Sequence, residues 1–168
     1  ITANSAGTLT GTSVLDNINT YIMPKAKSHG NWVIFSIGPS SDWSAIASSD
    51  NRINIFADNI VSMINAYGFD GVDIDWETPF EYEAERFTEL MRVVYTKVKA
   101  NNPNHLVTAA IAGGIWQPPK YDLENSHQYL DYINMMTYGM VSHHGYYQNA
   151  LSRSTIYDDP TNEVGKTL

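Results

Sequence analysis

The sequence predicts a single α/β domain in which parallel β-strands alternate with amphipathic helices. Short apolar runs alternate with longer segments whose apolar residues recur at helical spacing, which is the pattern of βα units. Gly, Pro and Asn mark most boundaries between these segments. The length of 168 residues suits one domain, and no internal repeat or low-complexity linker divides it. We therefore expect one domain over residues 1–168, with a polar, turn-rich tail over 152–168.

The first part of the chain predicts two helices on either side of a strand. Residues 13–28 predict a helix, and residues 33–37 predict a short strand that ends at Gly38. A second helix follows the candidate cap Ser49 and stops at Gly68. The apolar residues at helical spacing are Leu15, Ile18, Ile22 and Ala26 in the first helix and Ile53, Phe56, Ala57, Ile60 and Ile64 in the second.

The remaining elements continue the alternation. Pro79 stands just ahead of a long helix, which ends at the run Asn-Asn-Pro over 101–103. Its inner stripe is Ala84, Phe87, Met91, Val94 and Val98. The other predicted elements are strands over 71–76, 106–111 and 132–136 and a short helix over 122–129.

The most informative segment is residues 69–77, which read Phe-Asp-Gly-Val-Asp-Ile-Asp-Trp-Glu. Successive side chains of a strand point to opposite faces, so Asp73, Asp75 and Glu77 share one face. Like charges this close raise one another's pKa. Such an arrangement is typical of a catalytic site in which one carboxyl stays protonated near neutral pH. The apolar residues of the other face are Val72, Ile74 and Trp76.

Two other interpretations of this segment are weaker. A solvated edge strand would not place an apolar residue between each pair of acids, because one face would then be apolar in water. A calcium loop of the EF-hand type needs Gly at its sixth position and Glu at its twelfth. Counted from Asp73, these positions hold Thr78 and Ala84, so the calcium interpretation fails.

The pattern Asp70-x-x-Asp73-x-Asp75-x-Glu77 resembles the catalytic signature of family 18 glycoside hydrolases, the chitinase family. Trp76 before the glutamate adds to the resemblance. Three further stretches carry it along the chain. The first is Ser36-Ile37-Gly38, which is similar to the Ser-x-Gly-Gly motif of the third barrel strand but has Pro39 in place of the second Gly. The second is the run from Tyr132 to Tyr138, which is similar to the sixth strand. The third is Gln148-Asn149-Ala150-Leu151, which is similar to the stretch after that strand.

The resemblance implies a (β/α)₈ barrel of which only strands three to six and their helices are present. A whole barrel typically takes about 250 residues. A parallel sheet of four strands leaves two edges unpaired, so we expect self-association, a partner or low stability. The family also has Asp after the tyrosine of the sixth strand, where this chain has Gly139. In the family that Asp helps to hold the bent substrate and its acetamido group, so the resemblance does not by itself imply full activity for this chain.

The resemblance also implies catalytic roles. Glu77 is expected to be the general acid and base, since it comes last in the acidic series and so lies nearest the carboxyl ends of the strands. The N-acetyl oxygen of the substrate acts as nucleophile in this family. Asp75 would orient that acetamido group and share a proton with Asp73 or Glu77, and Tyr138 would hydrogen-bond the acetamido carbonyl.

The other candidate residues divide into structural and substrate-binding ones. The structural candidates are Asp70 and Gly71 before the acidic strand and Ser36 and Gly38 in the third-strand motif. The candidate substrate contacts are Met136, Trp43, Trp116 and Asn149. His143 and His144 are adjacent without a third ligand at suitable spacing, so we expect no metal.

The amino-acid composition excludes several classes of binding partner and of chemistry. The net charge of −8 argues against nucleic acid, and no apolar stretch is long enough to cross a bilayer. Cysteine is absent, which excludes disulfides and thiol chemistry. We expect no cofactor and a neutral polymer, chitin or chitooligosaccharide, as the partner. No signal peptide opens the chain, and secretion is inferred from that substrate alone.

The leading hypothesis is therefore a chitinase-type hydrolase of β-1,4-linked N-acetylglucosamine. One alternative is an endo-β-N-acetylglucosaminidase acting on N-glycan cores. Others are a chitinase-like lectin that binds without cleaving and an inactive piece of a barrel. The intact Glu77 favours the hydrolase, and Gly139 favours the lectin.

Overall fold

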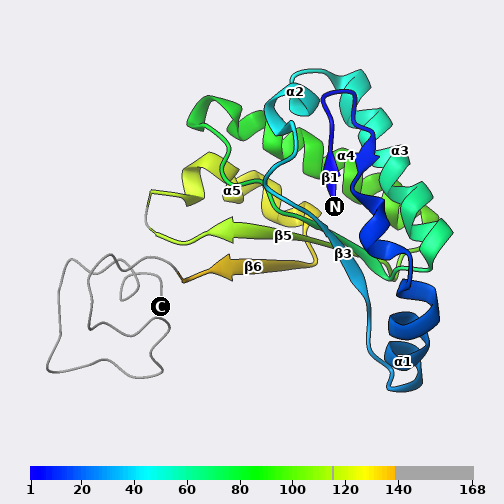
Figure 1. The fold of residues 1–168 in the computed structure, drawn as a ribbon. Helices are drawn as coiled ribbons and strands as arrows, with labels where there is room; N and C mark the ends of the chain where they lie inside the picture. Colours follow the sequence, from blue (N-terminus) through cyan, green and yellow to red (C-terminus); the bar gives the residue numbers. More distant parts are fainter. Residues whose placement is uncertain (115, 139–168) are drawn as a thin grey trace, which may run out of the picture.

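The structure is a computed structural model that describes residues 1–114 and 116–138. Within these residues one parallel sheet has its strands in the order β3-β4-β5-β6, which is also their order along the chain. The predicted parallel sheet is therefore confirmed (Figure 1). Its strands are β3 (Ile34–Ile37), β4 (Gly71–Ile74), β5 (Leu106–Ala112) and β6 (Tyr132–Met136).

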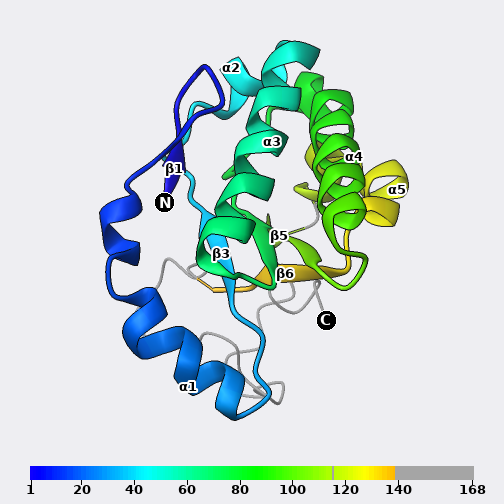
Figure 2. The same cartoon turned by 90° about the vertical axis from the view of Figure 1, so that its right-hand side faces the viewer.

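Two long helices, α3 (Asp50–Tyr67) and α4 (Ala84–Asn101), lie side by side over one face of the sheet (Figure 2). Ser49 is the N-cap residue of α3, and Gly68 ends that helix in the left-handed conformation at φ 73°. Both helices were predicted from their apolar stripes. The shorter helical elements are α2 (Trp43–Ala47), α5 (Leu123–Ser126), η3 (Glu81–Glu83), η4 (Pro118–Tyr121) and η5 (His127–Tyr129).

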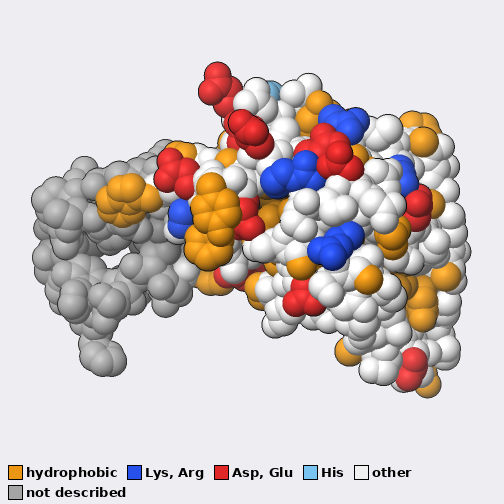
Figure 3. Space-filling model, turned by 90° about the horizontal axis from the view of Figure 1, so that it is seen from above, with side chains coloured by type: hydrophobic (Ala, Val, Ile, Leu, Met, Phe, Trp, Pro, Cys, Tyr) orange, Lys and Arg blue, Asp and Glu red, His pale blue; other side chains and the backbone are white. Residues whose placement is uncertain are grey.

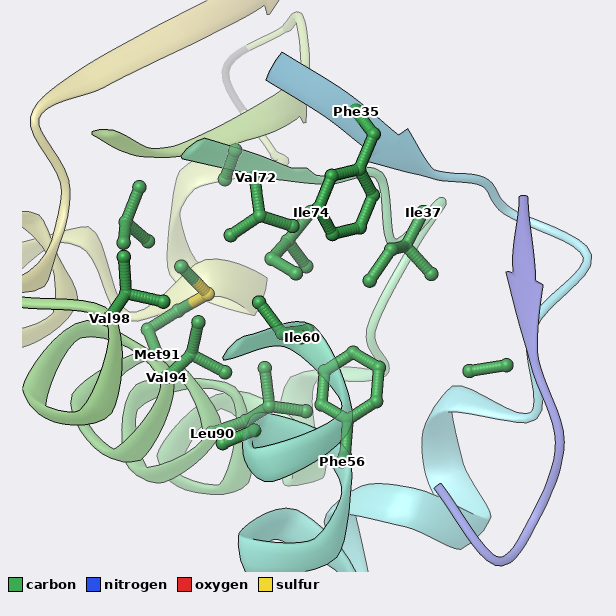
Figure 4. Packing of buried hydrophobic residues seen from close by; sticks show 14 of the residues in the cluster. Phe35, Ile37, Phe56, Ile60, Val72, Ile74, Leu90, Met91, Val94 and Val98 are labelled. Atoms are coloured by element: carbon green, nitrogen blue, oxygen red, sulfur yellow. The ribbon is translucent and has the colours of Figure 1, made fainter. Parts of the chain in front are cut away.

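The hydrophobic core lies between the sheet and these two helices (Figure 4). Phe56 and Ile60 of α3 and Leu90 of α4 are fully buried there, facing the apolar side chains of the strands. Burying each such side chain contributes about 1.5–3 kcal/mol. The strands contribute Phe35, Ile37, Val72, Ile74, Val107, Ala109 and Ile111.

The single helix predicted over residues 13–28 is wrong. The segment consists of a 3₁₀ turn η1 (Thr12–Leu15), a π-helical turn η2 (Ile18–Ile22) and the α-helix α1 (Met23–Ser28). Pro24 explains the break, because a proline inside a helix lacks an N–H donor and clashes with the carbonyl four residues earlier. It is tolerated here in the first turn of α1.

The N-terminal residues form a hairpin that the sequence did not predict. Strands β1 (Thr2–Ala3) and β2 (Leu9–Thr10) pair antiparallel and are too short to show a pattern. Ile1 lies beside the end of β3, because its amino group donates to the Ser36 carbonyl at 3.3 Å and its carbonyl accepts from Gly38 at 2.9 Å.

The outer surface of the helices carries both signs of charge. In Figure 3, lysine and arginine side chains lie beside acidic ones on this face, and three ion pairs are formed there. These pairs are Arg86–Asp50, Arg92–Glu89 and Lys97–Asp58. In the part of the chain that the structure describes, no helix combines the length and hydrophobicity needed to span a membrane.

Candidate active site

The acidic residues lie on the face of the sheet opposite the helices. Their exposure increases along the chain: Asp73 is only 8% exposed, Asp75 is partly buried and Glu77 is exposed. The strand itself ends at Ile74, two residues earlier than predicted. The Asp75 N–H still donates to the Ile37 carbonyl at 3.0 Å, so the alternation of side chains continues past the end of β4. The predicted separation of acids from apolar residues is thus confirmed.

Asp73 accepts hydrogen bonds from all three other strands of the sheet. Its Oδ2 accepts from the Ser36 hydroxyl on β3 at 2.9 Å. Its Oδ1 accepts from the Thr108 hydroxyl on β5 at 2.5 Å and from the Asn134 amide on β6 at 2.9 Å. The structure therefore brings Ser36, Thr108 and Asn134 together around Asp73.

Asp75 is the carboxyl with a strongly altered proton affinity. Its pKa is raised to about 6, first by burial and then by the negative charges of Glu77 and Asp73. An interaction with the Glu77 side chain adds a smaller rise. Its Oδ1 is buried and has no hydrogen-bond partner among the described residues. The pair Asp75–Glu77 can thus hold one proton close to neutral pH.

Trp76 supports this segment from the core side. Its ring stacks on Trp43 with a centroid distance of 5.8 Å and an interplanar angle of 11°, and its carbonyl accepts from the Tyr121 hydroxyl at 3.1 Å. Tyr121 is fully buried, and this burial raises the pKa of its hydroxyl to about 12. Tyr121 therefore acts here as a neutral donor.

The expectation that Trp43 contacts a sugar is corrected by this packing. Trp43 is 3% exposed, because Trp76 stacks on it and Phe56 packs edge-on at 5.7 Å. It begins the short helix α2 and belongs to the core, so no face of its ring is free for a ligand. The sequence pattern could not distinguish this helix from a loop.

Asp70 and Gly71 join β4 to its neighbours. The Asp70 carboxylate accepts from the Val33 N–H at 2.8 Å and pairs with Lys27 at 2.6 Å. Gly71 pairs with Leu106 in the parallel ladder, and its lack of a side chain permits a close approach of the strands. Both residues lie at the amino ends of the strands, whereas Glu77 lies beyond the carboxyl end of β4. Their position at the opposite end of the strand suits a structural role.

The other predicted site residues are placed as follows. Tyr138 is exposed just beyond β6, and Met136 is partly buried at the end of that strand. Trp116 is 62% exposed in the segment between β5 and η4. Gly38 follows β3 and donates to Ile1. Asn149 and Gly139 lie outside the described residues, as do both candidate metal-binding histidines. Across residues 1–114 and 116–138, no group of three or more His, Asp or Glu side chains could hold a metal ion.

Thr108 and Asn134 are site residues that the sequence reasoning missed. Each is a polar side chain inside a strand of mostly apolar residues, which was the available signal. Their proximity to Asp73 depends on the register of β4, β5 and β6, in which Thr108 lies opposite Asp73 and Asn134 opposite Ala110. Spacing within one strand does not determine that register.

The sequence of residues 3–165 matches the family model described as glycosyl hydrolases family 18. Chitinase 1 of Aphanocladium album is 29% identical over 163 residues, which are 90% of this chain and 38% of that protein. Chitinase B of Serratia marcescens is 31% identical over 146 residues, which are 74% of this chain and 29% of that protein. The chain thus spans less than half the length of these curated relatives.

Solved structures agree with this assignment. The group IV chitinase of Ostrinia furnacalis, solved in complex with allosamidin, superposes with a TM-score of 0.74 at 28% identity, covering 84% of this chain and 42% of the other. A chitinase from Bacteroides thetaiotaomicron gives a TM-score of 0.68 at 25% identity, with coverage of 82% and 43%. The four-stranded sheet with its helices is consistent with part of a (β/α)₈ barrel.

Proposed function

The chain belongs to glycoside hydrolase family 18, and from this membership we propose that it cleaves β-1,4-linked N-acetylglucosamine polymers with Glu77 as the general acid. The observation that carries the proposal is the pair Asp75–Glu77. These two carboxyls lie at the carboxyl end of β4, where burial and the negative charge of Glu77 raise the pKa of Asp75 to about 6. A site that holds one proton near neutral pH is suited to protonate a leaving group.

The reaction we propose has two steps. In the first, Glu77 donates a proton to the glycosidic oxygen while the N-acetyl oxygen of the substrate attacks C1. The C1–O bond breaks, and an oxazolinium ion forms as the shortened sugar leaves. In the second, the Glu77 carboxylate takes a proton from water, whose oxygen attacks C1 and reopens the ring. The substrate supplies the nucleophile, so a second carboxylate nucleophile is unnecessary.

Asp75 and Tyr138 would assist by holding the acetamido group. The carboxylate of Asp75 can accept the acetamido N–H and balance the positive charge of the oxazolinium ion. The proton that Glu77 takes from water in the second step restores the one proton that it holds together with Asp75. Tyr138 is exposed beyond the end of β6 in the described part of the chain, and its hydroxyl would donate to the acetamido oxygen. Asp73 is more deeply buried and acts on Asp75 through its negative charge.

Sugar binding without cleavage is the second candidate. The observation that favours it is Gly139, in the position where the family carries Asp next to the tyrosine. Glu77 favours the hydrolase, since a lectin has no need of an exposed acid at the end of this series. The names of the relatives favour chitin over N-glycan cores as the substrate. We also propose secretion, because chitin is an extracellular solid.

The test compares two tetrasaccharides that differ only in their acetyl groups. Chitotetraose and its fully de-N-acetylated form are incubated with the chain, and the products are followed by ¹H NMR. Substrate assistance predicts cleavage of the acetylated sugar alone, with the β-anomer appearing first. Cleavage of both sugars, or an initial α-anomer, would contradict the mechanism. Binding of chitotetraose without cleavage would favour the lectin.

A further inference from the structure

Asn134 connects the edge strand β6 to the acidic residue at the centre of the sheet. Its side-chain amide donates to Asp73 Oδ1 at 2.9 Å and lies 3.5 Å from the Thr108 hydroxyl. Thr108 donates to the same Asp73 oxygen at 2.5 Å. The link therefore passes across β5, which lies between β4 and β6. Asn134 and Asp73 are 61 residues apart in the chain.

These donors determine which carboxyl can receive a proton. A carboxylate that accepts hydrogen bonds on both oxygens is stabilised in its ionised form, and protonation would cost it one of those bonds. Asp73 has two donors on Oδ1 and one, from Ser36, on Oδ2. Asp75 has an unpartnered buried Oδ1, as far as the described residues show. The shared proton is therefore better placed on Asp75 than on Asp73.

We propose that Asn134 and Thr108 are positioning residues for the reaction, because they hold Asp73 as a hydrogen-bond acceptor and so direct the shared proton to Asp75 and Glu77. The consequence for catalysis rests on the proposed function. The consequence for proton location does not, because it follows from the hydrogen bonds alone. Ser36 completes the donor set on β3.

Few charged groups face this cluster. From β4 and the residues that follow it come Asp75 and Glu77, whose charges act on one another and on the cluster. Strands β3, β5 and β6 present only neutral donors to Asp73 among the described residues. Tyr121 lies near Asp75 and Glu77 and is neutral, since its pKa is raised to about 12. No described lysine or arginine makes an ion pair with any of the three acids, so the donors are what stabilises the charge on Asp73.

The first test follows the carboxyl carbons of the full chain by ¹³C NMR. The pH is varied from about 3 to about 9, so that the range covers both the ordinary carboxyl pKa and the raised pKa of Asp75. The variant Asn134→Leu keeps the volume of the side chain and removes its donor. We expect the titration midpoint of the Asp75 carboxyl to fall by about 0.5 to 1 unit, as the loss of one charge-assisted hydrogen bond within the cluster predicts. Met135→Leu is the control, since Met135 is the adjacent β6 residue on the opposite face.

A folded Asn134→Leu variant that titrates like the wild-type chain would overturn the proposal. If Asn134→Leu does not fold, Thr108→Val serves as the second variant. It removes the other donor to Asp73 Oδ1, and valine has the same shape as threonine at this buried position. The same shift is expected for it, and its absence counts equally against the proposal.

The second test measures hydrolysis of chitotetraose over the same pH range. We expect Asn134→Leu to lower kcat about tenfold, with little change in KM and with the acid limb of the kcat profile displaced, as for a lost proton-positioning contact. A fall in activity at every pH in proportion to the folded fraction would indicate a merely structural role and contradict the proposal. If the wild-type chain does not hydrolyse chitotetraose, the proposed function fails, while the NMR titration still decides where the proton lies.

Discussion

Gly71 and Leu106 approach so closely that a β-carbon on Gly71 would lie 2.2 Å from the Leu106 carbonyl oxygen. The two residues are partners at the start of the β4–β5 ladder, two positions before Asp73 meets Thr108. The carbonyl carbon and the nitrogen of Leu106 would each lie 2.8 Å from that β-carbon. Only glycine allows this approach, and the approach sets the register in which Thr108 reaches Asp73.

Gly71→Ala is therefore expected to destabilise the fold. The β-carbon would meet backbone atoms, which cannot rotate away, so we expect a loss of about 3 kcal/mol or more, at the upper end of overpacking effects. Urea denaturation followed by circular dichroism measures it. Gly38→Ala is the matched control, because its nearest neighbour would be the Ile1 carbonyl oxygen at 3.6 Å. Equal stability of the two variants would show that β5 can move away from Gly71.

At the amino ends of the strands, an aspartate twice joins the backbone of the neighbouring strand to a lysine of a helix; we call this arrangement a clamp. Asp70 precedes β4, exchanges two hydrogen bonds with Val33 and pairs with Lys27 at 2.6 Å. Asp131 precedes β6, exchanges two hydrogen bonds with Val107 and pairs with Lys99 at 2.8 Å. In each case the lysine comes from the helix before the neighbouring strand, so one acid joins a helix and two strands.

The two clamps should differ in strength. Lys27 has 51% of its side chain exposed, whereas Lys99 has 17% and also donates to the His105 carbonyl at 2.6 Å. Exposed pairs contribute about 0–1 kcal/mol, so we expect Lys27→Met to lie within that range. Lys99→Met should cost about 1–3 kcal/mol, since it leaves a partly buried carboxylate without its cation. Denaturation in urea at low and high salt distinguishes them, and a reversed order would contradict this comparison.

Asp75→Asn should stabilise the protein above pH 6. The pKa of Asp75 is raised from 3.8 to about 6, so ionising it costs more in the folded than in the unfolded state. The wild-type chain loses stability as the pH rises from 3.8 through about 6, and the amide avoids that loss. Thermal denaturation at pH 8 and pH 4 should show a gain in Tm for Asp75→Asn that shrinks at the lower pH. Glu124→Gln, at an exposed position, controls for net charge. A gain independent of pH would contradict the explanation.

Two tryptophans should respond in opposite ways to substitution. Trp43→Ala removes a core ring packed on Trp76 and should cost about 3–5 kcal/mol of stability. Trp116→Ala changes an exposed side chain, so its stability should stay within about 0.5 kcal/mol of the wild type. If Trp116 stacks on a sugar, its loss should weaken chitotetraose binding about fivefold, or roughly 1 kcal/mol, in calorimetry on a Glu77→Gln background. Trp43→Phe should leave the affinity for chitotetraose unchanged. A loss of binding in that variant without a loss of stability would show that Trp43 contacts the sugar after all.

The parts of the fold that were predictable depend on local patterns. The alternation of acidic and apolar residues shows in the six consecutive residues 72–77 and is reproduced by their burial. The stripes of α3 and α4 recur over several turns, which makes them equally readable. The resemblance to family 18 rests on the same acidic run and on three other short stretches, which are likewise local patterns.

The parts that were missed depend on contacts between distant segments. Trp43 was expected to contact substrate rather than to lie in the core, because the five residues of α2 are too few to show a helical period. The break near Pro24 was overlooked, since apolar residues keep their spacing across it. Thr108 and Asn134 belong to the site only because the ladders place them around Asp73. Propensity and spacing within one segment carry no information on such pairings.

The most direct test of the central claim is the rate at which the chain and its Glu77→Gln variant release the fluorophore from a chitobiose glycoside. Glutamine keeps the shape of Glu77 and cannot donate the proton, so we expect the rate to fall by about 10²- to 10⁴-fold. Equal binding of chitotetraose by both proteins in calorimetry would confirm that the variant site is intact. A variant that retains the wild-type rate would contradict the assignment of Glu77 as the general acid.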